Sequence, residues 1–279
     1  VKKFTFRKYQ ASDAVSWNEF VKNSVNGTFL FNRNFMDYHS DRFADYSIIV
    51  EDSKKCVALF PANISNNSVH SHQGLTYGGL IFKDDFKLQN LIELMYQMLQ
   101  FFESEKITTL CIKSIPYIYF KKPADGLSYA LFLLKAKLTR RDALATIDLS
   151  QPLSYIKEPQ SNVNVGIKKA VSNGLVMEET EDLSLFWNEI LQPNLWQKFK
   201  TKPVHSLEEI QDLKSKFPES IRQFNVYFQG KIVSGTTIFV TENVAHAQYI
   251  STNSEGAKLG SLYFLHHQLF TEIFKEKKF

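Results

Sequence analysis

The chain has 279 residues, of which 44% are hydrophobic and 22% are charged, and its formal net charge is +4. This composition is ordinary for a globular protein and excludes a chain that is disordered throughout. The excess of basic residues is small, so binding of nucleic acid would depend on local clusters and not on the total charge. The length favours two domains of similar size.

Neither export nor a membrane span is expected. The sequence has no apolar run of about 18 residues, and its opening segment, VKKFTFRKYQ, lacks the apolar region of a signal peptide. Cys56 and Cys111 lie in apolar, strand-like segments without the spacing of metal ligands. We therefore expect two reduced core thiols, no metal site and a cytoplasmic location.

The first half of the chain predicts a hairpin, a third strand, a helix and a further strand. Residues 46–64 read as two strands with β-branched residues around a polar turn that begins at Asp52. The segment VHSHQGLTYGGL, residues 69–80, predicts the third strand. Apolar residues between Leu88 and Phe102 then recur at helical spacing. A short strand that begins at Ile107 is expected after this helix.

The second half repeats this order of elements. Residues 222–240 predict a hairpin with Gln229 and Gly230 at its turn, residues 242–253 predict a third strand, and residues 256–277 predict a helix. Since strand, strand, strand, glycine-bearing loop and helix occur twice, we interpret the chain as an internal duplication. The chain stops after the second helix, so we expect the second copy to lack its last strands.

The predicted fold is α/β (α+β), with two tandem units that each contain a mixed, mainly antiparallel sheet flanked by helices. The polar, basic stretch 136–141 gives the expected boundary, with a first unit of residues 1–138 and a second unit of residues 139–279. The second unit begins with helical segments. One of these helices is expected to end at Gly174, and another begins with a capping-box sequence at Ser206.

The segment EGAKLGSLYFL, at the start of the last predicted helix, resembles the pyrophosphate loop of the GNAT acyltransferase superfamily. Gly256, Leu259 and Gly260 match that motif, whereas Glu255 and Lys258 depart from it. Glycines in such a loop let backbone N–H groups approach phosphate oxygens at a helix N-terminus. The positive charge of Lys258 could supply part of the attraction for phosphate that Glu255 removes. The alternative is that the glycines only form a tight turn into a helix.

Two units of this kind in one chain resemble the Fem-type aminoacyltransferases and the FemAB-like acetyltransferases of bacteria. The tract NVGIKKAVSNGLVME is similar to the basic helix and glycine that open their second unit, and SHQGLTYGGL, KTKPVHSLEEI and AHAQYISTN add to the resemblance. The resemblance implies transfer of an acyl group, for example acetyl, from acyl-CoA to an amine acceptor. The first alternative is transfer of an amino acid from aminoacyl-tRNA to a cell-wall precursor. The second, which Glu255 favours, is a non-catalytic binding protein that kept the fold.

The resemblance also implies which residues would act. The acyl donor, acetyl-CoA or another acyl-CoA, would contact Gln248, Ile250, Ser251, Gly256, Lys258, Leu259, Gly260 and Ser261. A general base has to remove the proton of the amine, for which His205, His246 and Glu242 are candidates. The expected catalytic residues are His205, Tyr249 and Glu242. The contacts expected for the acceptor are Gln73, Tyr77 and Lys202. A solvent-facing histidine at position 205 and a bulged strand with packing glycines at residues 69–80 are the alternatives.

Overall fold

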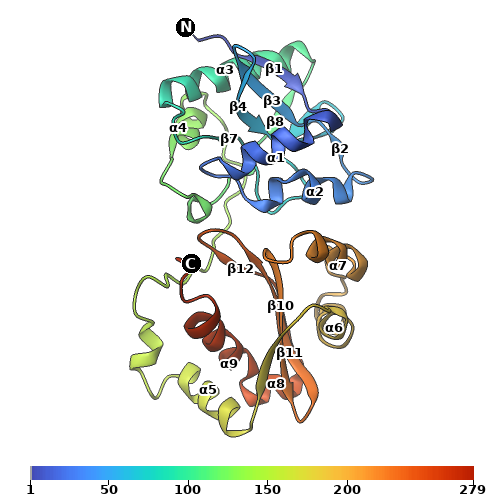
Figure 1. Cartoon of the computed structure of the whole chain (residues 1–279), viewed down its shortest axis with the longest axis vertical. Coiled ribbons are helices and arrows are strands. Elements are labelled where there is room, and N and C mark those ends of the chain that lie inside the picture. The colour runs from blue at the N-terminus through green and yellow to red at the C-terminus, as the bar shows by residue number, and fades with distance from the viewer. Residues whose placement is uncertain (1) are drawn as a thin grey trace. The chain divides into compact units, whose positions relative to one another are not determined.

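The computed structural model describes residues 2–279. They divide into two compact units, a first unit that ends at Leu144 and a second unit that runs from Ala145 to Phe279 (Figure 1). The boundary that we expected at 138/139 falls in the exposed segment that precedes Leu144.

The first unit contains two sheets. Its strands are β1 (Thr5–Lys8), β2 (Ala44–Asp45), β3 (Ile48–Asp52), β4 (Lys55–Phe60), β5 (Asn63–Ser65), β6 (Ser68–His70), β7 (Ile81–Phe82) and β8 (Thr109–Cys111). Its helices are η1 (Ala11–Asp13), α1 (Ala14–Lys22), η2 (Phe29–Phe31), α2 (Arg33–Met36), η3 (Asp37–His39), α3 (Leu88–Ser104), η4 (Tyr117–Tyr119) and α4 (Gly126–Leu133). Strands β1, β3, β4 and β7 form one antiparallel sheet in that order, and β2, β5, β6 and β8 form the other.

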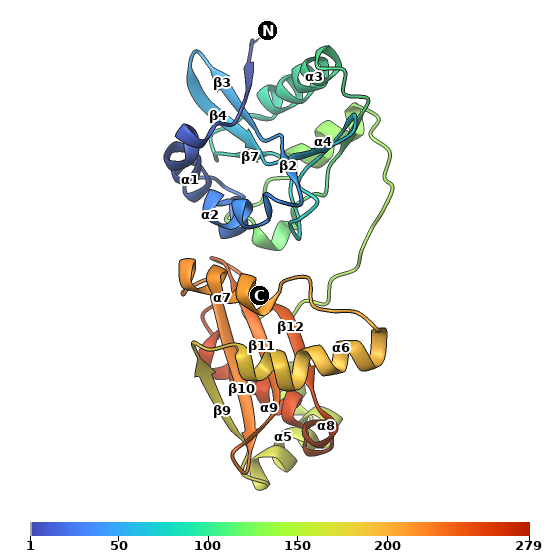
Figure 2. The same ribbon diagram turned by 90° about the vertical axis from the view of Figure 1, so that its right-hand side faces the viewer.

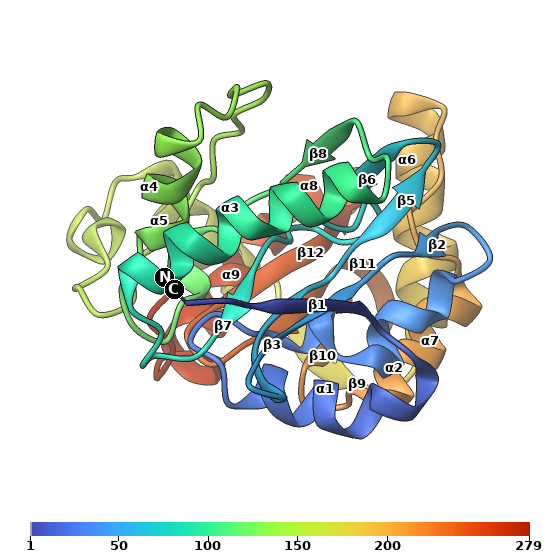
Figure 3. The same ribbon diagram turned by 90° about the horizontal axis from the view of Figure 1, so that it is seen from above.

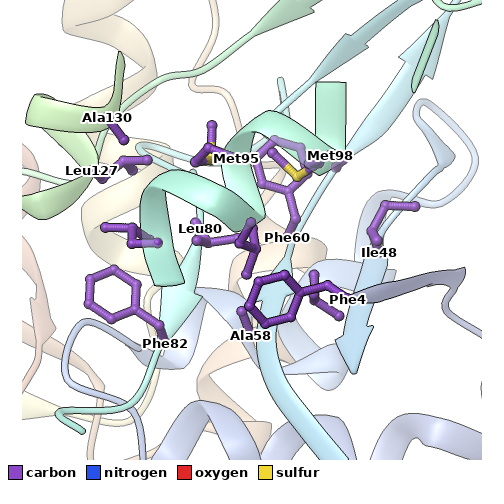
Figure 4. Packing of buried hydrophobic residues seen from close by; sticks show 14 of the residues in the cluster. Phe4, Ile48, Ala58, Phe60, Leu80, Phe82, Met95, Met98, Leu127 and Ala130 are labelled. Carbon is purple, nitrogen blue, oxygen red and sulfur yellow. The ribbon is translucent and has the colours of Figure 1, made fainter. Parts of the chain in front are cut away.

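The core of the first unit lies between the β1–β3–β4–β7 sheet and α3. Ile48 and Phe60 project from the sheet, and Met95 and Met98 project from α3 toward them (Figure 4). The helices α1 and α2 lie on the other side of this sheet (Figure 3). The predicted hairpin and the predicted helix are therefore confirmed as β3–β4 and α3.

The prediction of a third strand over residues 69–80 is wrong for most of that segment. Only β6 forms within it, and β6 pairs with β5 and β8 in the second sheet. The strand that completes the first sheet is β7, in which Phe82 pairs with Ala58 of β4. Between β6 and β7 the backbone takes positive φ angles of 70° at His72 and 111° at Gly79. These left-handed positions interrupt an extended strand.

The second unit contains one antiparallel sheet in the order β12–β11–β10–β9. Its strands are β9 (Val176–Thr180), β10 (Ile221–Phe228), β11 (Lys231–Val240) and β12 (Ala245–Thr252). Its helices are η5 (Ser154–Lys157), α5 (Asn162–Ser172), the π-helix η6 (Phe186–Leu191), α6 (Gln192–Phe199), α7 (Leu207–Lys216), α8 (Ser254–Leu259), α9 (Ser261–Gln268) and the π-helix η7 (Leu269–Ile273). The sheet lies between α5 and α9 on one face and α6 and α7 on the other (Figures 1 and 2).

The two sheets have the same strand order relative to the chain. In each unit the first strand pairs with the second, the second with the third and the third with the fourth, and helices connect the first strand to the second. A helix follows the fourth strand, α3 in the first unit and α8 with α9 in the second. The chain is therefore mixed α/β with mainly antiparallel sheets, as predicted.

The two thiols differ in their surroundings. Cys56 is half-buried, and burial raises its pKa to about 11. Cys111 is exposed, so the expectation of a core position is wrong for this residue. No helix in residues 2–279 has the length and apolar character needed to cross a membrane.

Candidate active site

The sheet of the second unit has a polar face beneath η6. Side chains alternate along β10, so Phe224 and Val226 face α5 and α9 while Gln223 and Asn225 face the opposite side. Thr237 Oγ1 donates a hydrogen bond to Gln223 Oε1 at 2.6 Å, and Gln223 Nε2 donates to Asn225 Oδ1 at 2.8 Å. These three polar residues are at most 1% exposed. The hydrogen bonds therefore offset the cost of removing them from water.

Tyr249 and His205 meet on this face, although 44 positions separate them in the sequence. The hydroxyl oxygen of Tyr249 lies 2.6 Å from His205 Nδ1 and accepts a bond of 3.2 Å from the backbone N–H of His205. Which of the two groups donates in this contact depends on the tautomer of the imidazole: with the ring proton on Nε2, the Tyr249 hydroxyl donates to Nδ1. Burial raises the pKa of Tyr249, and the bond from the His205 backbone acts in the opposite direction.

The loop between α6 and α7 fixes the position of His205. Helix α6 ends at Phe199 and is followed by Lys200, which has a left-handed φ of 54°. Ser206 caps the start of α7: its Oγ accepts from the Glu209 N–H at 3.1 Å, and Glu209 Oε2 accepts from the Ser206 N–H at 2.9 Å. The predicted capping box is confirmed. His205 directly precedes it and is only 5% exposed, so it does not face solvent.

The π-helix η6 places Trp187 against Tyr249. Their ring centroids are 4.8 Å apart, and the ring planes are inclined by 75°. Trp187 is fully buried, and its Nε1 has no hydrogen-bond partner among the described residues. A buried unpaired N–H is costly, and π-helical turns often occur at functional sites. Trp187, which contacts Tyr249, therefore carries a buried N–H donor without a partner.

A β-bulge in β12 lies next to Tyr249. Thr237 pairs with Tyr249 and Ile238 pairs with Ala247, so Gln248 has no opposite residue on β11. Bulges redirect side chains and are frequent beside active sites. The Oε1 atom of Gln248 is buried, and it too has no hydrogen-bond partner within residues 2–279.

The segment after β12 is a short helix and not an open loop. Asn253 caps α8, because its Oδ1 accepts from the Gly256 N–H at 2.8 Å and its carbonyl accepts from the Ala257 N–H at 3.0 Å. The Gly260 N–H donates to the Ala257 carbonyl at 3.3 Å. These three amides are therefore already bonded within the protein.

Gly256 and Gly260 allow close packing. A Cβ at Gly256 would lie 2.5 Å from both Thr252 Oγ1 and the Val233 carbonyl oxygen. Gly260 has a φ of 78°, and a Cβ there would lie 2.5 Å from the carbonyl oxygen of Gly166 in α5. Both glycines are thus needed where the chain turns from β12 into α9, which matches the tight-turn alternative.

Asn194 of α6 links that helix to the end of β12. Its Nδ2 donates to Ser251 Oγ at 2.8 Å and to the Thr252 carbonyl at 2.6 Å. Ser261 is fully buried, and its Oγ lies 3.1 Å from Thr252 Oγ1. Ile250 has 42% of its surface exposed. Of the donor contacts expected on β12, Ile250 is therefore the most accessible.

The remaining candidates of the second unit do not join the pair formed by Tyr249 and His205. Lys202 and Lys258 are exposed, and Leu259 packs against the core beside α9. Glu242 is exposed in the turn before β12.

Gln73 and Tyr77 of the first unit have different surroundings. Gln73 is exposed, its N–H donates to Asn63 Oδ1 at 2.8 Å, and its Oε1 accepts from Asn63 Nδ2 at 2.8 Å. Tyr77 is only 2% exposed and donates its hydroxyl proton to Thr28 Oγ1 at 3.1 Å. Tyr77 is therefore a core residue and offers almost no surface to an acceptor.

Trp187 and Asn194 were missed by sequence reasoning. Both lie between Gly174 and Ser206, where the sequence predicts helical segments but no site at either position. The spacing of apolar residues does not reveal which of them faces a polar sheet. Residues 2–279 bring no three histidine, cysteine or acidic side chains close enough to hold a metal ion.

Comparison with known proteins finds likeness in structure alone. No family model and no curated protein sequence matches the chain. The crystal structure of FemX superposes with a TM-score of 0.65 at 9% identity, over 98% of this chain and 86% of FemX. The structure of L-PGS from Bacillus licheniformis gives a TM-score of 0.58 at 9% identity, over 95% of this chain and 72% of that one.

A third similar structure is the C-terminal domain of a putative lysylphosphatidylglycerol synthetase from Agrobacterium fabrum. Its TM-score is 0.57 at 13% identity, over 95% of this chain and 75% of that one. At such low identities the likeness concerns the fold. The chain thus shares its fold with FemX and with these synthetases, which agrees with the FemAB-like resemblance of its sequence.

Proposed function

We propose that the second unit transfers an acyl group from an activated ester or thioester to an amine, and that Tyr249 and His205 carry the proton. The observation on which this proposal rests is the 2.6 Å contact between the Tyr249 hydroxyl oxygen and His205 Nδ1. Positioned acids and bases of this kind contribute substantially to acyl transfer. The FemAB-like fold and the adjacent bulge at Gln248 support the proposal.

In the proposed reaction the amine nitrogen attacks the carbonyl carbon of the donor. The Tyr249 oxygen accepts the amine proton while its own proton passes to His205 Nδ1. The bond between the carbonyl carbon and the leaving oxygen or sulfur then breaks. The leaving atom receives the Tyr249 proton, and His205 returns its extra proton to Tyr249. The amine proton thus ends on the leaving group, and both side chains regain their starting states.

Backbone groups of β12 are the proposed site for the charge that develops on the carbonyl oxygen of the donor. Strand β12 is the edge of its sheet within the described residues, and the bulge changes the direction of its backbone at Gln248. Amide N–H groups directed at the oxyanion are commonly a large catalytic contribution. We assign this part to the backbone from Gln248 to Ser251, with Ile250 as a side-chain contact of the donor.

Two classes of donor, acyl-CoA and aminoacyl-tRNA, fit this chemistry. Acyl-CoA requires a cradle for its pyrophosphate, for which Gly256, Lys258, Leu259, Gly260 and Ser261 are the candidates. The amides of Gly256 and Gly260 are hydrogen-bonded inside the protein, and Ser261 is buried. This arrangement disfavours the pyrophosphate cradle and favours aminoacyl-tRNA, whose activated ester needs no such loop.

An exposed strip of aromatic and basic residues gives a second reason to favour aminoacyl-tRNA. Trp196 and Phe199 of α6 are 57% and 68% exposed, and Lys198, Lys200 and Lys202 are exposed between and after them. Aromatic rings stack on unpaired bases, and lysines neutralise phosphates. The strip leads along the chain to His205. A cell-wall precursor with a free amine is the proposed acceptor class, as the resemblance of the sequence to the Fem-type aminoacyltransferases implies.

Donor binding separates the two classes. We expect acetyl-CoA to leave the unfolding temperature of the chain unchanged, because the glycine turn has no free cradle. A ligand at 100 times its dissociation constant would stabilise by about 2.7 kcal/mol, so a clear upward shift with acetyl-CoA would restore acyl-CoA as the donor. If neither acetyl-CoA nor aminoacyl-tRNA binds, the chain is better explained as a non-catalytic binding protein.

RNA binding should depend on salt through the strip on α6. We expect the affinity for lysyl-tRNA, measured by fluorescence anisotropy at several salt concentrations, to fall steeply as salt rises. The slope of log K against log salt should decrease by about 0.7 to 0.9 in Lys202→Ser, because one phosphate contact is lost. Lys231→Ser, at an exposed position on β11, is the matched control and should leave the slope unchanged. Equal slopes for both variants would contradict a role for the strip.

A further inference from the structure

Helix α4 is apolar on two opposite faces. Leu127 and Ala130 are buried, and Leu131 and Leu134 pack partly against the same core. These positions follow the spacing of one helix face. A surface helix normally carries polar residues on the other side, so the residues on the outward face of α4 need an explanation.

The outward face of α4 exposes large apolar side chains. Tyr129, Phe132 and Leu133 are 49%, 75% and 44% exposed, and they follow one another at helical spacing. Leu138, just beyond the helix, is 69% exposed. An isolated exposed apolar residue is ordinary, but several together indicate an interaction surface.

The segment that follows α4 is strongly basic and exposed. Lys135, Lys137, Arg140 and Arg141 are all exposed within a stretch of chain whose only acidic residue is Asp142. Asp142 accepts an ion pair from Arg140 at 2.9 Å, which leaves an excess of positive charge. The exposed apolar face of α4 therefore adjoins a cationic rim.

We propose that the outward face of α4 and the basic segment that follows it bind the surface of a membrane with anionic lipids. The exposed apolar side chains lie on the outward face of a helix beside a row of cations, an arrangement that suits insertion among lipid headgroups. Long lysine and arginine side chains reach the headgroup phosphates while their stems stay on apolar surface. The charge of the rim complements a negative surface, to which each cation adds affinity.

Vesicle co-sedimentation of the full chain tests this proposal. We expect binding to vesicles of equal parts phosphatidylcholine and phosphatidylglycerol, and much weaker binding to phosphatidylcholine alone. Phe132→Ser should lower the partition coefficient by about tenfold, because the variant has no aromatic ring to insert into the lipid. Replacing Lys135 and Lys137 together by serine should lower it by about thirtyfold on the anionic vesicles only.

Two matched controls keep the test specific to this surface. Tyr96→Ser removes an exposed aromatic ring, 54% exposed, from α3 of the same unit, and Lys55→Ser removes an exposed cation from β4. Neither change should alter binding. The proposal is overturned if the chain does not bind anionic vesicles or if Phe132→Ser binds as well as the unchanged chain. Loss of self-association in Phe132→Ser, measured by sedimentation velocity, would instead assign the face to a second copy of the chain.

Discussion

Replacing Tyr249 with phenylalanine is expected to slow acyl transfer by about a hundredfold or more. The variant keeps the aromatic ring that packs on Trp187 but removes the hydroxyl that bridges His205 Nδ1 and the His205 backbone N–H. The assay follows the hydroxamate formed when lysyl-tRNA is the donor and hydroxylamine is the amine. The background reaction without protein is subtracted.

Tyr227→Phe is the matched control for this prediction. Tyr227 belongs to the same sheet, and its hydroxyl accepts from Asn225 Nδ2 at 3.2 Å. Its loss costs a hydrogen bond of similar kind without touching His205, so the rate should stay near that of the unchanged chain. If Tyr249→Phe and Tyr227→Phe behave alike, Tyr249 has a structural role and the proton path is contradicted. His205→Gln should show a pH profile of the rate that differs from that of the unchanged chain.

Acid is expected to destabilise the first unit through His72. This side chain is 4% exposed, and its ring stacks on that of His39 with centroids 4.9 Å apart. Burial, followed by the neighbouring His39, lowers the pKa of His72 from 6.5 to about 3. The unfolded chain therefore takes up a proton as the pH falls through 6.5, and the folded chain does not until the pH is near 3. The contribution of His72 to stability is complete above pH 6.5, the pKa of the unfolded state. It is lost as the pH falls from 6.5 toward 3.

The expected loss is about 2 kcal/mol of unfolding free energy between pH 7.5 and pH 5. Burial lowers the pKa of His39 as well, so His39 acts in the same direction. Urea unfolding at the two pH values measures the difference. In His72→Asn the difference should shrink by about this amount, since asparagine tolerates the left-handed φ of 70° at this position. His70→Asn, two positions away, is the control; an equal effect of both changes would contradict the prediction.

The sequence predicted the elements that local signals define. The turns after Asp52 and Phe228 and the caps at Ser206 and Gly174 depend on neighbouring residues, and all four form as expected. Strand β1 was missed because only Phe4 and Phe6 mark its buried side, and so short an alternation does not separate a strand from a loop. The strand expected over residues 69–80 was wrong because glycine and positive φ angles interrupt it.

The candidate site was predictable in its residue types but not in its contacts. His205 and Tyr249 were both expected to act, yet their contact depends on how α7 packs against the sheet. Trp187 became part of this cluster only through the π-helical turn of η6, which no spacing of apolar residues encodes. The glycines before α9 resembled a phosphate loop, but the cap at Asn253 and the close approach of Gly166 decide their actual surroundings.

The shared strand order of the two units has a consequence for how such chains diversify. In both units the first two strands of the sheet pair directly, and a helical segment connects them. This helical excursion starts at the end of the first strand and returns to the sheet at the adjoining end of the second. The excursion differs between the units, with α1 and α2 in one and η6, α6 and α7 in the other, while the four-stranded ladder is the same. The ladder thus tolerates exchange of that excursion as a cassette. In the second unit the cassette carries His205, Trp187 and Asn194, so chemistry can be gained or lost there without redesign of the sheet.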